Sequence, residues 1–219
     1  MKALVTGGRG RVGEAIAQRL EREGWSVLAA GRADGDVSQP EQARALVERV
    51  VGELGGLDLL VNAAGEGFAP KPFDELTEGD WDAAFGATAK GSFFVTQAAA
   101  PHLRASRGCV VMIEDVAGYQ PWPAFAAHSA AKAAQAMLTR VLARALAPEV
   151  RVCGVAPGPV AVERDQEERR AAETLLERVG SPEDVAAAVA YLAGADFVTG
   201  TTLFVDGGRA LKSGAPSGP

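Results

Sequence analysis

Three side chains in the second half of the chain have the types and spacing for proton transfer. His128 and Lys132 are four residues apart in an Ala-rich stretch typical of a helix, so they should lie on one helix face. Asp115 lies thirteen residues before His128. A charged Lys132 disfavours the imidazolium form of His128 and Asp115 favours it, so either His128 or Asp115 could act as the proton donor. We predict Asp115, His128 and Lys132 as the catalytic residues.

A glycine-rich segment near the N-terminus predicts a phosphate-binding turn. The segment Gly8-Arg-Gly10-Arg-Val-Gly13 matches G-x-G-x-x-G between an expected strand, Lys2–Thr6, and an expected helix over residues 12–23. Glycines allow the tight turn and the close approach of backbone N–H groups, and the helix N-terminus then faces a pyrophosphate. The placement of the motif therefore predicts a dinucleotide site.

The end of the second expected strand, Ser26–Ala30, bears on which dinucleotide binds. An acidic residue there would bind a ribose 2′-hydroxyl, whereas an arginine would accommodate a 2′-phosphate. The chain continues with Gly31-Arg32, and Arg9 and Arg11 add positive charge nearby. We expect NADP(H) to be preferred, with NAD(H) possible; the alternative is that Arg32 is an ordinary solvated arginine.

The elements that position these residues alternate between short apolar strands and longer helical segments. This alternation predicts an α/β fold: one doubly wound (Rossmann-like) domain over residues 1–212, with a mostly parallel sheet and helices on both faces. The other expected strands are 57–62, 109–113, 150–155 and 201–205, and the other expected helices are 40–54, 80–102, 126–146 and one opening at Ser181. Residues 213–219 are expected to form a flexible tail.

Composition excludes several classes of protein. The formal net charge is −6 and no block of Lys and Arg forms a basic patch, which argues against nucleic-acid binding. No apolar run reaches the roughly 18 residues needed to span a bilayer, and the first residues enter a strand without room for a signal peptide, so we expect no membrane partner and a cytoplasmic location. Cys109 and Cys153 lie in apolar runs, which favours buried thiols and no metal site.

Several short motifs occur together in one order: Thr6-Gly7, Asp36-Val37, Asn62-Ala63-Ala64-Gly65, the Asp115–His128–Lys132 spacing and Pro157-Gly158. With them, the chain resembles the short-chain dehydrogenases/reductases over essentially its whole length. The resemblance implies hydride transfer between a nicotinamide cofactor and a small-molecule carbonyl or imine, in a protein that is usually a homotetramer. The cofactor-binding residues it implies are Thr6, Gly7, Arg9, Arg11, Val12, Gly13, Arg32, Asp36, Val37, Asn62, Ala63, Ala64, Lys132, Pro157, Gly158 and Val160.

Within that family the details are similar to the pteridine reductases, which carry an arginine at the position of Arg11 and an aspartate at that of Asp115. The Phe68-Ala-Pro-Lys-Pro72 loop also resembles theirs. A flat pterin could stack between the nicotinamide and Phe68, and its N–H groups could donate to a carboxylate. The substrate-binding residues predicted on this basis are Arg11, Phe68, Asp115, Trp122 and His128.

Other positions depart from the family pattern. His128 stands where relatives have a tyrosine, and Thr88 where they have an asparagine. Three interpretations stay open: an NADPH-dependent reductase of a pterin or other planar C=N substrate, a carbonyl reductase for a ketone or acyl thioester, and a cofactor-binding protein with little or no turnover. In the last case His128 is a position without a chemical role.

Overall fold

A computed structural model of the chain describes residues 1–66 and 69–212. Among these residues, six strands form one sheet in the order β2-β1-β3-β4-β5-β6, and every neighbouring pair is parallel. The strands are β1 (Lys2–Thr6), β2 (Ser26–Ala30), β3 (Leu59–Asn62), β4 (Cys109–Ile113), β5 (Arg151–Pro157) and β6 (Thr202–Val205). The predicted doubly wound, parallel α/β sheet is confirmed.

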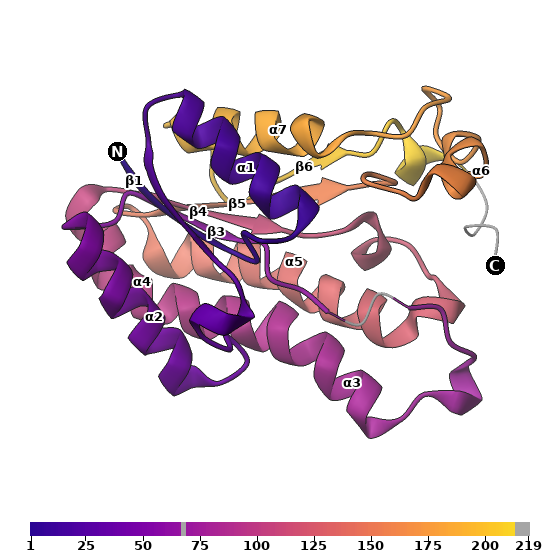
Figure 1. Cartoon of the computed structure of the whole chain (residues 1–219), viewed down its shortest axis with the longest axis horizontal. Helices are drawn as coiled ribbons and strands as arrows, with labels where there is room; N and C mark the ends of the chain where they lie inside the picture. The colour runs from indigo at the N-terminus through magenta and orange to yellow at the C-terminus, as the bar shows by residue number, and fades with distance from the viewer. Residues whose placement is uncertain (67–68, 213–219) are drawn as a thin grey trace.

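Helices cover both faces of the sheet (Figure 1). On one face lie α1 (Arg11–Arg22) and α7 (Pro182–Gly194), which pack against each other. On the other face lie α2 (Pro40–Leu54), α4 (Gly91–Ser106) and α5 (Ala126–Leu146). The short helix α6 (Glu167–Ala171) lies beyond the carboxyl end of the sheet (Figure 1). No helix among the described residues is long and apolar enough to cross a bilayer.

Successive residues of the central strands serve two apolar layers, because side chains alternate between the faces of a sheet. Leu60 and Val110 pack in the layer that includes residues of α2, α4 and α5, whereas Val61 and Val111 pack in the layer with α1 and α7. Every residue of β3 and β4 is buried. Near-continuous apolar strands are what a parallel sheet with helices on both faces requires.

The helix predicted over residues 80–102 begins earlier, ends later and changes form in the middle. It starts as α3 (Glu78–Phe85), where the Thr77 hydroxyl accepts from the Asp80 N–H and the Asp80 carboxylate accepts from the Thr77 N–H. A π-helical turn, Gly86–Lys90, then joins α3 to α4. Because i→i+5 hydrogen bonding has no periodic sequence signature, the pattern of apolar residues did not predict this turn.

The strand order places a crevice at the carboxyl ends of β1 and β3. The chain leaves β1 toward α1 on one face and leaves β3 toward the helices on the other face, and such a switch point opens a site between the two connections. Only residues 31–39 connect β2 to α2, with a 3₁₀ turn at Arg32–Asp34. This connection contains no further strand, and β2 is the edge strand of the sheet, with its carboxyl end beside the crevice.

Candidate active site and cofactor cleft

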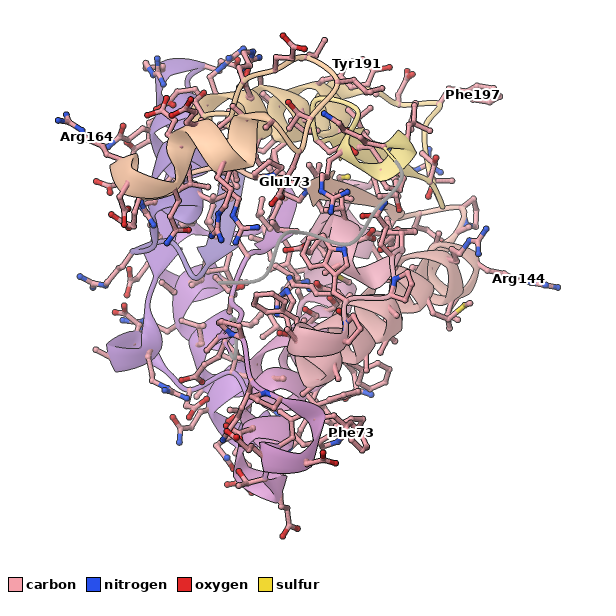
Figure 2. All side chains as sticks on the ribbon, turned by 90° about the vertical axis from the view of Figure 1, so that its right-hand side faces the viewer. Phe73, Arg144, Arg164, Glu173, Tyr191 and Phe197 are labelled. Carbon is pink, nitrogen blue, oxygen red and sulfur yellow. The ribbon has the colours of Figure 1, made fainter. Side chains whose placement is uncertain are left out.

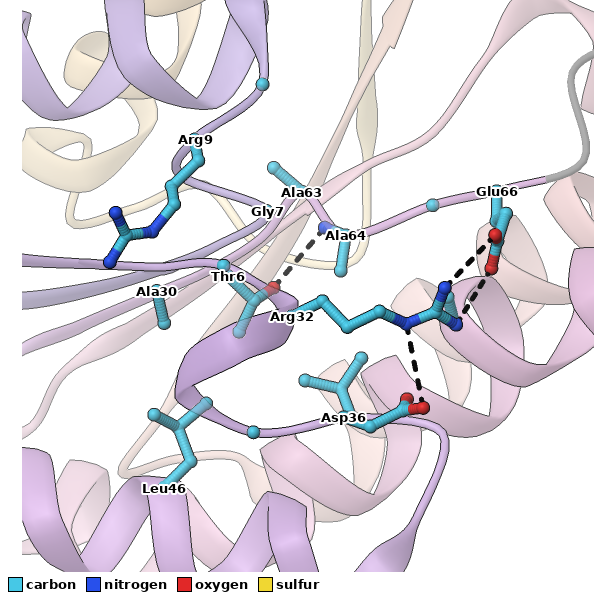
Figure 3. A pocket seen from close by; sticks show the side chains of 16 residues that line it. Thr6, Gly7, Arg9, Ala30, Arg32, Asp36, Leu46, Ala63, Ala64 and Glu66 are labelled. Atoms are coloured by element: carbon cyan, nitrogen blue, oxygen red, sulfur yellow. Dashed lines mark hydrogen bonds and ion pairs between the residues drawn. The ribbon is translucent and has the colours of Figure 1, made fainter.

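A cleft of about 340 Å³ lies at this switch point (Figure 3). Eight of the residues predicted to bind the cofactor line it: Thr6, Gly7, Arg9, Arg32, Asp36, Val37, Ala63 and Ala64. The lining also includes Gly10 and Gly65, which belong to the two glycine-containing motifs noted in the sequence, and residues that the sequence did not single out for this role: Ala30, Gly31, Gly35, Leu46, Glu66 and Ala87. The turn after β1, the turn after β2 and the loop after β3 thus meet in one site, as a dinucleotide cleft requires.

Two glycines make the floor of the cleft possible. A Cβ on Gly13 would lie 2.3 Å from the carbonyl oxygen of Gly7, so α1 can approach the turn only without a side chain there. Gly7 has a φ of +66°, and a Cβ on it would lie 2.6 Å from the Ala63 carbonyl oxygen. The N-cap of α1 is Gly10, which has no side chain to cap the helix N–H groups. The geometry therefore fits a cofactor pyrophosphate at this helix end.

The arginines of the cleft are paired with carboxylates, which the sequence pattern did not predict. Arg32 donates to both oxygens of Glu66, with its Nη1 and Nη2 atoms 3.2 and 3.1 Å from Oε1 and Oε2, and its Nε lies 3.7 Å from Oδ2 of Asp36. Hydrogen bonds from Ser38 and the charge of Arg32 lower the pKa of Asp36. Arg9 pairs with Asp34 at 3.1 Å. The positive charge expected for a 2′-phosphate is present, but it is already neutralised.

The predicted catalytic aspartate and histidine lie together. Nε2 of His128, on α5, is 3.4 Å from Oδ2 of Asp115, which follows β4. The other oxygen, Oδ1, accepts a 2.7 Å hydrogen bond from the backbone N–H of Ala117. The imidazole is buried and the carboxylate partly exposed. The pair can therefore pass a proton between the interior and a molecule bound in front of Asp115.

Lys132, one helical turn after His128, is buried behind this pair. Its Nζ donates to the Ile113 carbonyl oxygen at 2.7 Å and to Gln135 Oε1 at 3.0 Å, and Gln135 Nε2 donates to Ser92 Oγ at 2.8 Å. Burial lowers the pKa of Lys132, and the charges of Asp115 and Glu114 oppose that shift. These hydrogen bonds fix the lysine ammonium at the carboxyl end of β4.

Sequence reasoning missed Glu114, a buried carboxylate beside the catalytic pair. It accepts hydrogen bonds from the hydroxyls of Tyr119 (2.5 Å), Thr139 (2.6 Å) and Thr202 (3.0 Å). Partial burial of the phenol and, second, the bond to Glu114 raise the pKa of Tyr119. A carboxylate directly after an apolar strand was the available signal, because such a residue must find several donors when the strand is buried.

Some predicted cofactor residues lie outside the lining of the cleft. Val12 packs against the apolar layer of α1 and α7. Asn62 donates through Nδ2 to Thr96 Oγ1 at 3.0 Å and contacts the Met112 sulfur, so its amide is bonded within the interior.

The predicted cofactor residues after β5 also lie outside the lining. The strand ends at Pro157, the Gly158 N–H donates to the Val205 carbonyl oxygen, and Val160 forms a bridge with Gly180. The roles of these residues toward a cofactor stay predictions.

The predicted substrate residues are only partly brought together. Arg11 is exposed and its Nη2 lies 3.1 Å from Oε1 of Glu163. Trp122 packs edge-on against Phe125 with ring centroids 6.0 Å apart, and the Arg209 guanidinium lies 5.6 Å from its ring centroid. Phe68 lies outside the described residues. Of the predicted set, therefore, Asp115 and His128 are in direct contact.

A charged cluster joins the segment around α6 to the C-terminal part of the chain. Glu173 lies 3.2 Å from the Arg170 guanidinium and 3.6 Å from that of Arg209. Figure 2 shows Glu173 within this end of the molecule, whereas Arg164 projects outward. Because Arg209 also packs on Trp122, the cluster connects the α6 segment to a predicted wall of the substrate site.

Comparison with known proteins decides the family. A sequence profile described as enoyl-(acyl carrier protein) reductase matches residues 9–210. The chain is 37% identical to 3beta-hydroxysteroid dehydrogenase 1 of Eggerthella lenta over 246 aligned positions, covering 96% of this chain and 94% of that protein. The chain belongs to the short-chain dehydrogenase/reductase family. It is an oxidoreductase by family, and members of the family use NAD(P)(H).

Solved structures of short-chain dehydrogenases/reductases share the fold over nearly the whole chain. An aldohexose dehydrogenase from Thermoplasma acidophilum has a TM-score of 0.89 at 27% identity, covering 97% of this chain and 94% of that one. A 7α-hydroxysteroid dehydrogenase, complexed with NADH and 7-oxo glycochenodeoxycholic acid, has a TM-score of 0.88 at 26% identity, covering 96% and 94%. The alignment of 246 positions exceeds the 219 residues of this chain, so the chain is shorter than the Eggerthella relative within the shared region.

Proposed function

We propose that this chain is an NADPH-dependent reductase that transfers hydride to a pterin-like or other planar C=N substrate. The observation that carries the proposal is Asp115: one carboxylate oxygen is fixed by the Ala117 N–H and the other lies beside the buried His128 imidazole. A fixed carboxylate accepts hydrogen bonds from amino and ring N–H groups more strongly than a hydroxyl does. A pterin presents such groups, whereas a simple ketone presents none.

The proposed reaction assigns a role to each of several residues of the chain. NADPH, when bound, supplies the hydride, which adds to the carbon of the C=N bond. Asp115 orients the substrate, and the imidazolium of His128 donates the proton that the substrate nitrogen requires, directly or through Asp115. Lys132 would hold the ribose and nicotinamide through an N–H other than the two that donate to Ile113 and Gln135. The glycine turn and the N-terminus of α1 bind the pyrophosphate.

The proposed preference for NADPH rests on two arginines that line the cleft, Arg9 and Arg32. Guanidinium groups pair bidentately with phosphate, and both groups lie where the turn after β2 meets the glycine turn. The neighbouring carboxylates reduce this preference, and NAD(H) stays a possible cofactor.

A carbonyl reductase is the second candidate. It is favoured by the relatives named above, a 3beta-hydroxysteroid dehydrogenase and a 7α-hydroxysteroid dehydrogenase in complex with a 7-oxo compound. In that case His128 would donate its proton to a carbonyl oxygen, and Asp115 would hold the imidazole in place.

The test is NADPH oxidation by the purified protein with dihydrobiopterin or dihydrofolate, compared with ketones and acetoacetyl thioesters. Turnover of the pterins alone supports the proposal, and turnover of ketones alone supports the second candidate. NADPH binding, measured by calorimetry, without turnover of any substrate contradicts both and leaves a cofactor-binding protein.

We also propose a cytoplasmic homotetramer, the usual assembly of the family. In support, β6 forms the far edge of the sheet and carries the exposed apolar side chains Leu203 and Phe204. Light scattering on the purified protein gives the mass of the assembly. A monomer at micromolar concentration would contradict this part of the proposal.

A further inference from the structure

The Arg32–Glu66 ion pair extends over the cofactor cleft. Arg32 follows β2 and Glu66 lies in the loop after β3, so the pair connects the two segments that flank β1 at its carboxyl end. Figure 3 shows the Arg32 side chain reaching across the cleft, with Glu66 at its tip and Asp36 below its Nε. Both partners line the cleft.

The contact uses the part of the guanidinium that best recognises phosphate. Arg32 directs Nη1 and Nη2 to the two carboxylate oxygens of Glu66, at 3.2 and 3.1 Å. Paired N–H donors of this kind match two oxygens of a carboxylate or of a phosphate equally well. A 2′-phosphate that approached Arg32 would therefore need these donors, and would meet the negative charge of Glu66.

We propose that Glu66 is a specificity-determining residue, whose carboxylate competes with the 2′-phosphate of NADP(H) for Arg32 and so narrows the preference for NADP(H) over NAD(H). The inference rests on the proposed cofactor role of the cleft. NAD(H) has a 2′-hydroxyl in place of the phosphate, and a hydroxyl can donate to a carboxylate without displacing it. The free energy needed to separate Glu66 from Arg32 therefore weakens the binding of NADP(H) and not that of NAD(H).

The other charged groups of the cleft are less suited to this role. Asp34 is held by Arg9 at 3.1 Å, by Arg49 at 3.5 Å and by the backbone N–H of Gly31 at 2.9 Å. Asp36 accepts a 3.0 Å hydrogen bond from the Ser38 N–H. Among the described residues, the hydrogen bonds of the Glu66 carboxylate are those from Arg32. Glu66 is therefore the carboxylate that can be displaced from its arginine at the smallest cost in free energy.

The solvent exposure of the pair sets the size of the expected effect. The Arg32 and Glu66 side chains are 66% and 44% exposed, so water and salt screen the attraction. Exposed ion pairs contribute little, which limits the gain from removing the competitor to about three- to fivefold in affinity. Such a change is small enough to tune the choice of cofactor and large enough to measure.

The experiment compares Glu66→Gln with the unaltered protein in calorimetric titrations with NADP⁺ and NAD⁺. Glutamine keeps the size of the side chain and removes its charge. The dissociation constant for NADP⁺ should fall about three- to fivefold, while that for NAD⁺ should change less than about twofold. Glu23→Gln is the matched control, because Glu23 pairs with Arg19 on α1 away from the cleft and its loss changes the net charge equally. The control should leave both constants unchanged.

Arg32→Gln separates competition for Arg32 from general repulsion. In that background, Glu66→Gln should no longer alter the ratio of the two dissociation constants. An unchanged or reduced NADP⁺ affinity in Glu66→Gln, or a gain that persists without Arg32, would overturn the proposal. If neither cofactor binds the unaltered protein or any variant, the cofactor role of the cleft fails as well. If NADP⁺ binds but the ratio does not move, the role of Glu66 alone fails.

Discussion

Nε2 of His128 lies 3.4 Å from Oδ2 of Asp115, and the backbone N–H of Ala117 fixes the other oxygen of that carboxylate. The resemblance to the family implies a serine and a tyrosine at these two positions. Replacement of both by a carboxylate and an imidazole in contact gives a pair that can share a proton. This direct contact favours a working donor over a position that has lost its role.

Replacement of His128 tests whether the imidazole is the donor. His128→Gln keeps a polar side chain of similar size but cannot transfer a proton. We expect the rate constant for hydride transfer from NADPH to the substrate to fall by about 10²- to 10⁴-fold, because general acid catalysis contributes about that much. The dissociation constant for NADPH should stay within about twofold. Activity that rises in His128→Tyr would instead indicate that the histidine has no part in proton transfer.

The Glu114–Tyr119 contact predicts a delayed ionisation of the tyrosine. Burial and the neighbouring carboxylate raise the pKa of Tyr119 above its ordinary value of 10.0. The folded state therefore favours the neutral phenol, and the stability this gives is complete below pH 10 and lost as the pH rises toward the folded pKa. Ultraviolet titration of the phenolate should show a high-pH phase that Tyr119→Phe removes and Glu114→Gln moves to lower pH. A phase that stays in Tyr119→Phe would contradict the assignment.

Glu114→Gln should also destabilise the fold. The amide can accept hydrogen bonds at only one of its two heteroatoms, so part of the network with Thr139, Thr202 and Tyr119 is left without an acceptor. Loss of a buried acceptor costs about 1–3 kcal/mol, which urea denaturation can resolve. Equal stability of the variant and the unaltered protein would contradict a stabilising role for this network.

Two glycine-to-alanine changes distinguish a required glycine from a dispensable one. In Gly13→Ala the new methyl group would meet the Gly7 carbonyl oxygen at 2.3 Å, so α1 must move. Because the N-terminus of α1 is expected to hold the pyrophosphate, the dissociation constant for NADPH should rise at least about tenfold. A Cβ on Gly52, inside α2, meets nothing within 4 Å. Gly52→Ala should therefore leave binding unchanged and raise stability by about 0.5–1 kcal/mol. Unaltered NADPH binding in Gly13→Ala would contradict the location of the pyrophosphate.

Local chemistry made some elements predictable to the residue. The bounds of α2 (Pro40–Leu54) and α5 (Ala126–Leu146) agree with expectation. Pro40 marks the start of α2 at its first turn, and Pro148 follows the end of α5 by two residues. The π-helical turn at Gly86–Lys90 gives no such signal. Its form depends on packing against neighbouring elements, including α5.

The ion pairs of the cleft could not be predicted for a different reason. Arg32 and Glu66 are thirty-four residues apart, and they meet because β2 and β3 both flank β1. The alternation of strands and helices predicts a parallel sheet but not the order of its strands. The sequence therefore predicted which arginine faces the cleft, while the carboxylate opposite it follows from the topology alone.

The most direct test of the account is the substrate dependence of Asp115→Ser, measured as kcat/KM for NADPH-dependent reduction of dihydrobiopterin and of a small ketone. Serine restores the residue that most of the family carries and removes the carboxylate acceptor. The account predicts a loss for the pterin that exceeds any loss for the ketone by at least about tenfold, since a hydrogen bond to a charged group contributes about 1.5–3 kcal/mol. An equal loss for both substrates, or an undiminished rate with the pterin, would contradict it.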